Sequence, residues 1–573
     1  MRRLDTDILI LGSGGAGLFA ALHAHRADPS LSITVAVKGL LGKCGCTRMV
    51  QGGYNVALAQ GDSVERHFMD TIEGGKWLPD QDLAWKLVTL AVERIHELEN
   101  ELGCFFDRNP DGTVHQKAFA GQTFDRTVHK GDLTGIEIIN RLAEQVWARR
   151  IHRLEEHRAV ELIKDRSGQA LAGVLMIDMR TGEYVFVRAK AVLLATGGGP
   201  TMYRYHTPSG DKSCDGLAMA LRAGLSLRDM EMVQFHPTGL LAGAHTRMTG
   251  TVLEEGLRGA GGYLLNGAKE RFMPKYDPLA ERATRDLVSR AMYTEMRKGN
   301  VTPNGGLYIA MAHLGPEQVA KNFKGMVERC ADCGFDLAGG LVEVVPTAHY
   351  MMGGVQFGLD CTTALPGLFV AGEDAGGVHG ANRLGGNGVA NSTVFGAVAG
   401  DTMAAWVAKE GARRAPDEEA IVAAVERCEP RIVPGHGGLE ALRERLAAVM
   451  WEKVGIIRDR AGLESALGEL DALAAELEAS GIADAERAFN LTWHDWLNLK
   501  SLTQVSRVIA QAALAREDSR GAHYREDYPE AGALERSAYS SVRLAGDAHE
   551  VTMKPVAFTR VRPGETLLSP GAS

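Results

Sequence analysis

Two cysteines lie one residue apart in a glycine-rich stretch, and thiols at this spacing can carry out several kinds of chemistry. Residues 42–53 read GKCGCTRMVQGG, in which Cys44 and Cys46 precede a Gln-Gly-Gly turn. The thiols could bind a metal ion, form a disulfide or line a site that the glycines build. Two ligands alone do not make a metal site. A second pair, Cys330 and Cys333, has no partner pair, and we interpret it as structural.

The elements around an earlier glycine run indicate a nucleotide site. Residues 7–11 are predicted to form a buried strand, residues 18–25 a helix and residues 32–38 a second strand. The run GSGGAG lies between the first strand and the helix, which is the order of a βαβ unit that binds a dinucleotide phosphate. The same turn could also bind nothing. The second strand ends at Lys38, without the acidic residue that usually holds the ribose.

Two later segments of the same type favour FAD. Residues 189–199 and 365–376 are apolar runs that end in Thr-Gly-Gly and in a glycine followed by Glu373. The Glu373 carboxylate can accept ribose or ribityl hydroxyls, while a helix N-terminus faces the diphosphate. A domain that binds only a nicotinamide cofactor would be complete by about residue 150. We therefore predict FAD.

The composition excludes several classes of protein. The chain has 573 residues, of which 45 % are apolar, so several domains are expected. Its net charge of −9 argues against nucleic acid or an anionic membrane as a partner. Eight irregularly spaced cysteines indicate a reducing compartment, and we predict a cytoplasmic protein. The N-terminal apolar run is interpreted as a strand rather than a signal peptide, and no apolar run reaches the ~18 residues of a membrane span.

The pattern of elements predicts four regions. We expect an α/β FAD-binding Rossmann-like domain formed by residues 1–234 and 349–416. Residues 235–348 have a mixed pattern and are predicted to be an inserted α+β capping domain. Residues 417–526 are rich in Ala, Leu, Glu and Arg at helical spacing, which indicates a helical bundle. Residues 527–573 are predicted to be a small irregular C-terminal region with a few strand-like pieces.

Six segments, in order along the chain, carry a resemblance to a known family. They are FHPTGL (235–240), EEGLRGAGGYLLN (254–266), ERFMPKYDPLAERATRDLVSRA (270–291), PTAHYMMGG (346–354), HGANRLGGN (379–387) and AREDSRGAHYRED (515–527). With these segments the chain resembles the flavoprotein subunit of succinate dehydrogenase and fumarate reductase, and L-aspartate oxidase is a more distant relative. The stretches 67–84 and 118–135 favour the dehydrogenase/reductase branch. The resemblance extends from about residue 6 to about residue 530.

The resemblance implies an FAD-dependent oxidoreductase that interconverts the C–C and C=C bonds of a succinate- or fumarate-like dicarboxylate. Hydride moves to or from the flavin, Arg285 transfers the proton, and Glu255 and Arg258 form the relay that restores it. The substrate-binding residues that it implies are His236, His349, Arg383, Phe119 and Glu254. The cofactor-binding residues that we predict are Gly12, Gly14, Gly15, Ala16, Gly17, Lys38, Cys46, Thr47, Gln51, Gly52, Gly53, Ala195, Thr196, Gly197, Gly198, Asp215, Glu373, Arg383, Asn387, Gly388 and Val389.

Some positions depart from the family pattern. Glu254 replaces a threonine that helps to bind the second substrate carboxylate, and a carboxylate there would repel that group. We expect His245 or Arg247 to neutralise it, unless the substrate carries an amino or neutral group at that end. Ala260 replaces a common glutamate.

Cys46 stands where covalent members of the family carry a histidine bonded to the flavin. We predict a free thiol near the flavin edge and non-covalent FAD. A thioether to the flavin and a redox or metal pair with Cys44 are the alternatives. Because the covalent bond raises the flavin potential in this family, its loss leads us to expect reduction of an activated C=C bond, or oxidation of something easier than succinate.

The sequence leaves the electron partner open. The chain has no array of cysteines for a cluster, so a separate iron–sulphur subunit is expected, and it would bring the chain to the inner face of a membrane. The alternatives are a stand-alone aspartate oxidase-like flavoenzyme that acts on an amino or substituted dicarboxylate, and a flavin-binding subunit with a degraded site. A homo-oligomer is possible through the C-terminal helices, which otherwise act as scaffold.

Overall fold

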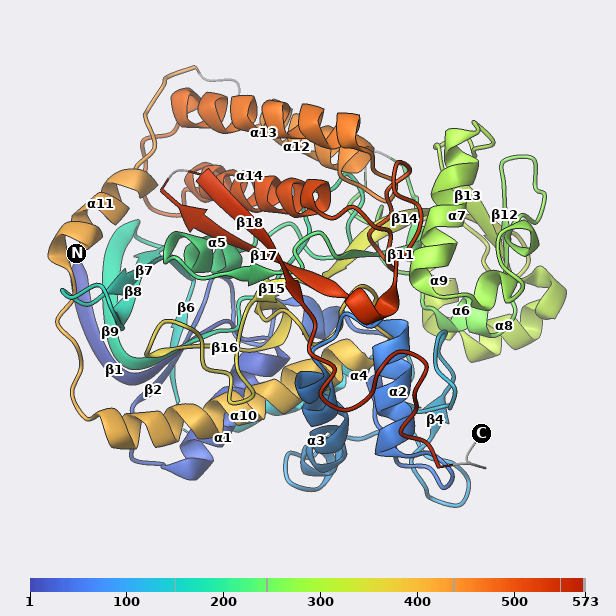
Figure 1. Ribbon diagram of the computed structural model, residues 1–573, viewed down its shortest axis with the longest axis horizontal. Coiled ribbons are helices and arrows are strands. Elements are labelled where there is room, and N and C mark those ends of the chain that lie inside the picture. The colour runs from blue at the N-terminus through green and yellow to red at the C-terminus, as the bar shows by residue number, and fades with distance from the viewer. Residues whose placement is uncertain (150, 244–245, 436–437, 547, 570–573) are drawn as a thin grey trace.

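The computed structural model describes the chain except for residues 150, 244–245, 436–437, 547 and 570–573. A central sheet and the helices on its faces form the body of the molecule, and a smaller lobe projects from one side (Figure 1). No helix in the described part of the chain is long and apolar enough to cross a bilayer.

The central sheet has seven strands in the order β6-β2-β1-β9-β8-β7, with β16 beside β9. Their bounds are β1 Arg2–Leu11, β2 Ile33–Val37, β6 His152–Glu155, β7 His157–Lys164, β8 Leu171–Asp178, β9 Glu183–Leu194 and β16 Leu368–Val370. The pairs β1–β2, β1–β9, β2–β6 and β9–β16 are parallel, whereas β7, β8 and β9 pair antiparallel. Ile8, Leu9 and Ile10 are fully buried, as expected of a parallel strand covered on both faces.

Two helices pack together beneath this sheet and both begin at the carboxyl ends of its strands (Figure 1). They are α1 (Gly15–Ala27) and α10 (Asn387–Glu410), so the two ends of the predicted discontinuous domain meet here. Further helices of this body are α2 Val64–Gly74, α3 Gln81–Asn100, α4 Thr134–Ala148 and α5 Asp215–Arg222. A small sheet contains β3 Tyr54–Asn55, β4 Gln116–Lys117 and β5 Thr127–Val128.

The lobe on the right of Figure 1 has its own sheet and its own hydrophobic core. Its strands are β11 Val233–Leu240, β12 Tyr263–Leu265, β13 Leu307–Ala310 and β14 Leu341–Met351, and its helices are α6 Gly256–Gly259, α7 Arg285–Arg297, α8 Pro316–Asn322 and α9 Lys324–Asp332. The predicted limits of the capping domain, residues 235 and 348, fall inside β11 and β14. The body and the lobe are thus joined by two paired strands.

The C-terminal part contains helices and one hairpin. The elements are α11 Glu418–Cys428, α12 Glu440–Lys453, α13 Arg460–Ser480, α14 Leu491–Ala515, β17 Ala538–Ala545 and β18 Ala548–Pro555. Strand β17 pairs with β10 (Leu227–Arg228), which in turn pairs with β15 (Gly354–Val355). The tail that we predicted to be mainly irregular therefore adds a hairpin to a sheet of the body. Val542 on β17 is fully buried in the hydrophobic core there.

Candidate active site

One cavity of about 650 Å³ extends from the glycine turn before α1 to the junction between the body and the lobe. Gly12, Gly14 and Gly15 line one end of it, and His236 and Arg285 line the other. The volume falls within the roughly 300–1,000 Å³ that is usual for ligand and cofactor sites. The site that the sequence predicts in separate segments is therefore a single space.

Two helix N-termini face the glycine end of the cavity. The N-cap residues of α1 and α10 are Gly14 and Gly386, which have no side chain to cap the helix. Among the described residues, only the first N–H of α1, that of Gly15, is accepted by a side chain, Thr47 Oγ1 at 3.1 Å. Gly12 has φ +111°, and a Cβ there would lie 2.1 Å from the Ala195 carbonyl oxygen, so this turn requires glycine. Uncapped N–H groups and helix dipoles at one place suit a diphosphate.

A charged cluster lies at the end of the second strand. Lys38 Nζ is 3.0 Å from Asp215 Oδ2, and Arg158 Nη2 is 2.7 Å from Asp215 Oδ1. Burial lowers the pKa of Lys38 to about 8, although Asp215 opposes this shift. Burial alone would raise the pKa of Asp215, but Arg158 and Lys38 hold it below its usual value. Asp215, in the first turn of α5, thus places a carboxylate beside the end of the second strand, which has none of its own.

Two more carboxylates lie near the Thr-Gly-Gly turn. Asp374 accepts hydrogen bonds from the backbone N–H groups of Thr196 (2.5 Å) and Gly197 (3.2 Å), which fixes the turn. Glu373 lines the cavity and accepts the Met351 N–H at 2.9 Å. Burial raises the pKa of Glu373 to about 7, although Met351 opposes this shift.

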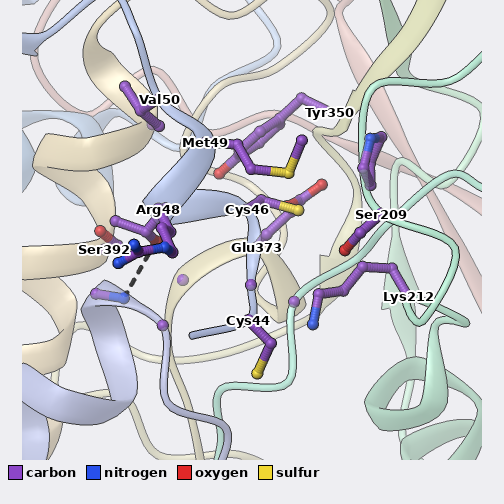
Figure 2. A pocket seen from close by; sticks show the side chains of 18 of the residues that line it. Cys44, Cys46, Arg48, Met49, Val50, Ser209, Lys212, Tyr350, Glu373 and Ser392 are labelled. Carbon is purple, nitrogen blue, oxygen red and sulfur yellow. Dashed lines mark hydrogen bonds between the residues drawn. The ribbon is translucent and has the colours of Figure 1, made fainter. Parts of the chain in front are cut away.

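Cys46 points into the cavity from a short 3-10 helix, Cys46–Met49 (Figure 2). Figure 2 shows its sulfur beside Glu373, whereas Cys44 lies apart from it. Both thiols are free, so the structure contains no disulfide between them. Burial raises the pKa of Cys46 to about 12, so the thiol is neutral near pH 7. Among the described residues, no group of three or more His, Cys, Asp or Glu side chains could hold a metal ion.

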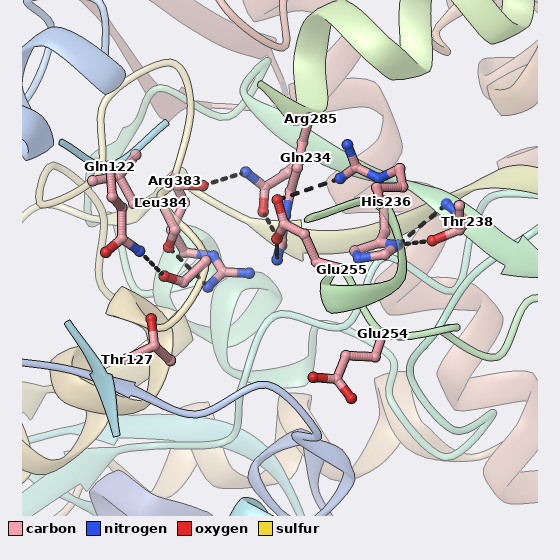
Figure 3. A network of polar contacts seen from close by, with 12 residues as sticks. Gln122, Thr127, Gln234, His236, Thr238, Glu254, Glu255, Arg285, Arg383 and Leu384 are labelled. Atoms are coloured by element: carbon pink, nitrogen blue, oxygen red, sulfur yellow. Dashed lines mark hydrogen bonds and ion pairs between the residues drawn. The ribbon is translucent and has the colours of Figure 1, made fainter. Parts of the chain in front are cut away.

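A guanidinium–carboxylate network forms the other end of the cavity (Figure 3). Arg285 donates to Glu255 Oε2 from Nε (2.9 Å) and Nη2 (2.5 Å), and to Gln234 Oε1 from Nη1 (3.1 Å). Arg258 Nη2 lies 3.3 Å from Glu255 Oε1, and its Nη1 donates to the Glu281 carbonyl. Burial would raise the pKa of Glu255, but Arg285 and Arg258 hold it below its usual value. Glu255 therefore stays ionised between two cations.

Two neutral imidazoles face this network. The rings of His236 and His349 are 5.4 Å apart, and burial lowers the pKa of each well below its usual value, with Arg285 adding to the effect. His236 Nδ1 accepts the Thr238 N–H at 3.3 Å. The neutral ring must then carry its proton on Nε2, which makes that nitrogen a hydrogen-bond donor for a ligand.

Arg383 lies in the same wall. Its guanidinium stacks 4.2 Å from the Tyr350 ring centroid, and burial lowers its pKa to about 10. Its Nε is buried and has no hydrogen-bond partner among the described residues. A buried donor without a partner is costly unless a ligand completes it, so Arg383 is suited to bind an anionic group.

The partner of Glu254 differs from our expectation. Lys117 Nζ lies 2.5 Å from Glu254 Oε1, and neither His245 nor Arg247 is needed to neutralise this carboxylate. His245 lies outside the described residues, and Arg247 is exposed. Lys117 is on β4, far from Glu254 in sequence, so local spacing could not reveal the pair.

The sequence profile of the FAD binding domain family matches residues 7–389, and that of the fumarate reductase flavoprotein C-terminal family matches residues 443–567. The chain belongs to the succinate dehydrogenase/fumarate reductase flavoprotein family. It is therefore an FAD-dependent oxidoreductase. A solved structure of a quinol–fumarate reductase with menaquinol molecules covers 98 % of this chain at a TM-score of 0.92 and 33 % identity, so the fold is shared over nearly the whole chain.

Several members of the family are similar over nearly their whole length. One subunit of the fumarate reductase (CoM/CoB) of Methanothermobacter marburgensis is 40 % identical over 92 % of this chain and 95 % of its own. The fumarate reductase flavoprotein subunit of Escherichia coli is 35 % identical over 92 % and 89 %. The solved structure of a mutated Escherichia coli quinol fumarate reductase FrdA has a TM-score of 0.91 at 33 % identity, with 99 % of each chain covered.

The cavity residues fit FAD. The uncapped ends of α1 and α10 suit the diphosphate, and Glu373 and Asp215 suit ribose or ribityl hydroxyls. Most of the predicted cofactor residues line the cavity, but Gly17, Gly198 and Asn387 do not. A Cβ at Gly17 would lie 2.0 Å from the Gly12 carbonyl oxygen, and Asn387 is held in a buried network by Asn55. These three act on the shape of the site rather than on its surface.

The predicted substrate residues and Arg285 and Glu255 line the cavity, while Arg258 lies behind Glu255. Sequence reasoning missed other lining residues: Arg158, Thr207, Lys212, Met248, Arg329, Tyr350 and Ser392. Thr207 holds the imidazole of His349, with 2.9 Å between Oγ1 and Nδ1. Tyr350 directly follows the predicted residue His349 in the sequence, and this position was the one signal that could have identified a missed lining residue.

Proposed function

We propose that this chain reduces the C=C bond of a fumarate-like carboxylic acid. The observation that carries this proposal is Arg285, held by Glu255 and Gln234 in the wall of the cavity that His236, His349 and Arg383 also line. This arrangement offers anion-binding donors and a positioned proton donor in one cavity. The fumarate reductase names of the relatives support the same function.

Each group has a separate role in the proposed reduction. FAD, when bound, supplies the hydride for one carbon of the double bond. His349 and Arg383 hold the carboxylate that draws charge from that carbon, since the planar guanidinium can pair with both oxygens. Arg285 gives a proton to the other carbon, so that one hydride and one proton together saturate the bond.

Arg285 needs a supply of protons, because a guanidinium is a weak acid with a pKa above ~12. Glu255 accepts a hydrogen bond from Arg285 at Oε2 and one from Arg258 at Oε1, which forms a route of hydrogen bonds Arg285–Glu255–Arg258. We infer that a proton reaches Arg285 through this relay after each turnover. A buried ion pair with only a structural role would need Arg285 and Glu255 alone, so the presence of Arg258 supports the relay.

We infer the preferred direction of the reaction from Cys46. A neutral thiol with a raised pKa stands at the flavin-linked position, which supports non-covalent FAD and a lower flavin potential than covalent members have. We infer that reduction of fumarate is faster than oxidation of succinate. The test is a pair of steady-state assays, one with reduced viologen and fumarate and one with succinate and an artificial acceptor. Faster succinate oxidation by non-covalent FAD would overturn the direction.

The electron donor is inferred to be an iron–sulphur subunit. The relatives are named as subunits, and this chain holds only eight scattered cysteines. Such a complex would also bring the chain to the inner face of a membrane. The stand-alone aspartate oxidase alternative is not favoured by the relatives. Co-purification of a cluster protein supports the subunit, and peroxide formation by the isolated chain contradicts it.

The residue test uses two arginines on α7. We expect Arg285→Gln to lower kcat for fumarate about 10²–10⁴-fold while FAD content is unchanged, because a general acid supplies that much. Arg297→Gln is the control, since Arg297 lies on the same helix as Arg285 and forms an exposed pair with Glu526 from the C-terminal part of the chain. Wild-type activity in Arg285→Gln would contradict the function and favour a degraded flavin-binding subunit.

A further inference from the structure

A carboxylate lies in the wall of a cavity that is otherwise suited to anions. Glu254 is 6 % exposed and lines the same space as His236, Arg285 and Arg383. Figure 3 shows it apart from the Arg285 network, with no contact to the residues drawn there. A carboxylate in this position repels an anionic group of the substrate, so its presence needs a chemical reason.

The cation that balances the charge of Glu254 is Lys117. Lys117 contacts Oε1 at 2.5 Å and lies 5.8 Å from the Phe119 ring centroid. Phe119 and Glu254 line the cavity, whereas Lys117 is not among the lining residues. Within the described residues, Glu254 Oε2 accepts no hydrogen bond. Glu254 therefore keeps one carboxylate oxygen for a further hydrogen-bond donor, and Glu254 rather than Lys117 belongs to the lining of the cavity.

The pair leaves the rest of the site unchanged in charge. Lys117 and Glu254 cancel each other, so the charge offered by Arg285 and Arg383 to a carboxylate elsewhere in the cavity is the same with or without them. Burial raises the pKa of Glu254 and Lys117 opposes the shift. Compared with the threonine of the family pattern, Glu254 changes only the local chemistry of this wall, because an ionised carboxylate accepts hydrogen bonds and cannot donate one.

An ionised carboxylate binds N–H and O–H groups, because it only accepts hydrogen bonds. A second carboxylate of the substrate at the same place would bring two like charges together. Resting on the proposed function, we propose that Glu254 selects a substrate whose second end carries a hydrogen-bond donor, such as a primary amide, in place of the second carboxylate of fumarate. His349 and Arg383 hold the carboxylate at the first end.

The experiment compares three substrates with the FAD-loaded full-length enzyme and reduced methyl viologen. They are fumarate, fumarate monoamide and 4-aminocrotonate, which carry an anion, a neutral donor and a cationic donor at the second end. We expect kcat/KM for a donor substrate to exceed that for fumarate by about tenfold or more, since a site with a buried polar group discriminates strongly. The better of the two donor substrates identifies the charge of the donor.

The matched variants are Glu254→Gln and Glu328→Gln. Glu254→Gln removes the charge at nearly constant shape, and we expect the donor-to-fumarate ratio to fall about tenfold, mainly through KM. Glu254→Thr serves as the second variant if the first does not fold. Glu328 forms an exposed pair with Lys324 on α9, so its variant should keep the wild-type ratio.

The outcomes separate this inference from the proposed function. Preference for fumarate in the wild type, with the same ratio in Glu254→Gln, overturns the role of Glu254 and leaves the reductase intact. No turnover of any of the three substrates overturns the reductase. In that case, flavin absorbance titrations with succinate and succinamate decide the specificity, and tighter binding of succinate would overturn it.

Discussion

Protonation of the Glu373 carboxylate should make both the stability of the protein and its affinity for FAD depend on pH. Burial raises its pKa to about 7, against an ordinary value near 4.5 in the unfolded chain. The folded protein then holds an extra proton between about pH 4.5 and 7, and its free energy of unfolding falls as the pH rises through this range. Asp374, with a pKa raised by burial to about 6, acts in the same direction.

We expect FAD affinity to show the opposite trend, because ribose or ribityl hydroxyls bind best to an ionised carboxylate. Affinity should rise as the pH increases through 7, and Glu373→Gln should lose about 1.5–3 kcal/mol of binding at pH 8 and less at pH 5.5. Fluorescence titration of the FAD-free protein from pH 5.5 to 8.5 measures this. An equal slope in the variant would exclude Glu373 as its source.

At the same scale, the sequence could single out side chains that belong to long motifs, whose roles stay predictions, but it could not reveal a partner that is remote along the chain. His236, Arg285, His349 and Arg383 come from four distant segments, and the resemblance named all of them. The Lys117 partner of Glu254 was missed, because the two residues are 137 positions apart and meet only through the tertiary fold.

The turn between β1 and α1 shows how an element positions the cofactor. Gly17 does not line the cavity, yet a Cβ there would lie 2.0 Å from the Gly12 carbonyl oxygen. The helix can therefore approach the strand closely enough for its first N–H groups to face the diphosphate only if residue 17 is glycine.

We expect Gly17→Ala to lose FAD and to lower stability by about 1–3 kcal/mol, the usual cost of inserting a methyl group without space. The flavin absorbance per protein and the thermal unfolding midpoint measure the two effects. Gly210→Ala is the control, since nothing lies within 4 Å of its Cβ and its backbone is not in the left-handed region. Full FAD content in Gly17→Ala would show that the turn can open without loss.

The βαβ unit was predictable because local signals agree there. The apolar run, the glycine turn and the helix occur within 38 residues, and the structure places β1, α1 and β2 at the expected positions. The hairpin of β17 and β18 was not predicted as such, because its pairing with β10 depends on a segment some 300 residues earlier. The predicted domain limits stay a prediction.

At the scale of the whole molecule, one arginine joins the C-terminal region to the body. Arg516, which follows α14, donates from Nε to Glu231 Oε1 at 2.6 Å and lies 3.4 Å from Asp229. All three side chains are buried. Burial and the nearby Glu231 raise the pKa of Asp229 to about 6, although Arg228 and Arg516 oppose the shift.

We expect Arg516→Met to destabilise the protein by about 3–5 kcal/mol at pH 8, since it leaves the buried Glu231 without its cation and leaves Asp229 with Arg228 alone. The loss should be smaller at pH 5, where Asp229 can take up a proton. Urea unfolding at both pH values measures it. Arg460→Met, which removes an exposed pair with Glu517, should have little effect, and equal losses at both pH values would contradict the account.

The paired strands β11 and β14 have a mechanical consequence. They cross from the body into the lobe, and they carry His236 and His349. If the lobe rotates about these two strands, His236 and His349 at the pivot move less than Glu254 and Arg285, which the lobe carries. Such a rotation would change the distance between the two sets of side chains and therefore the shape of the cavity that both line.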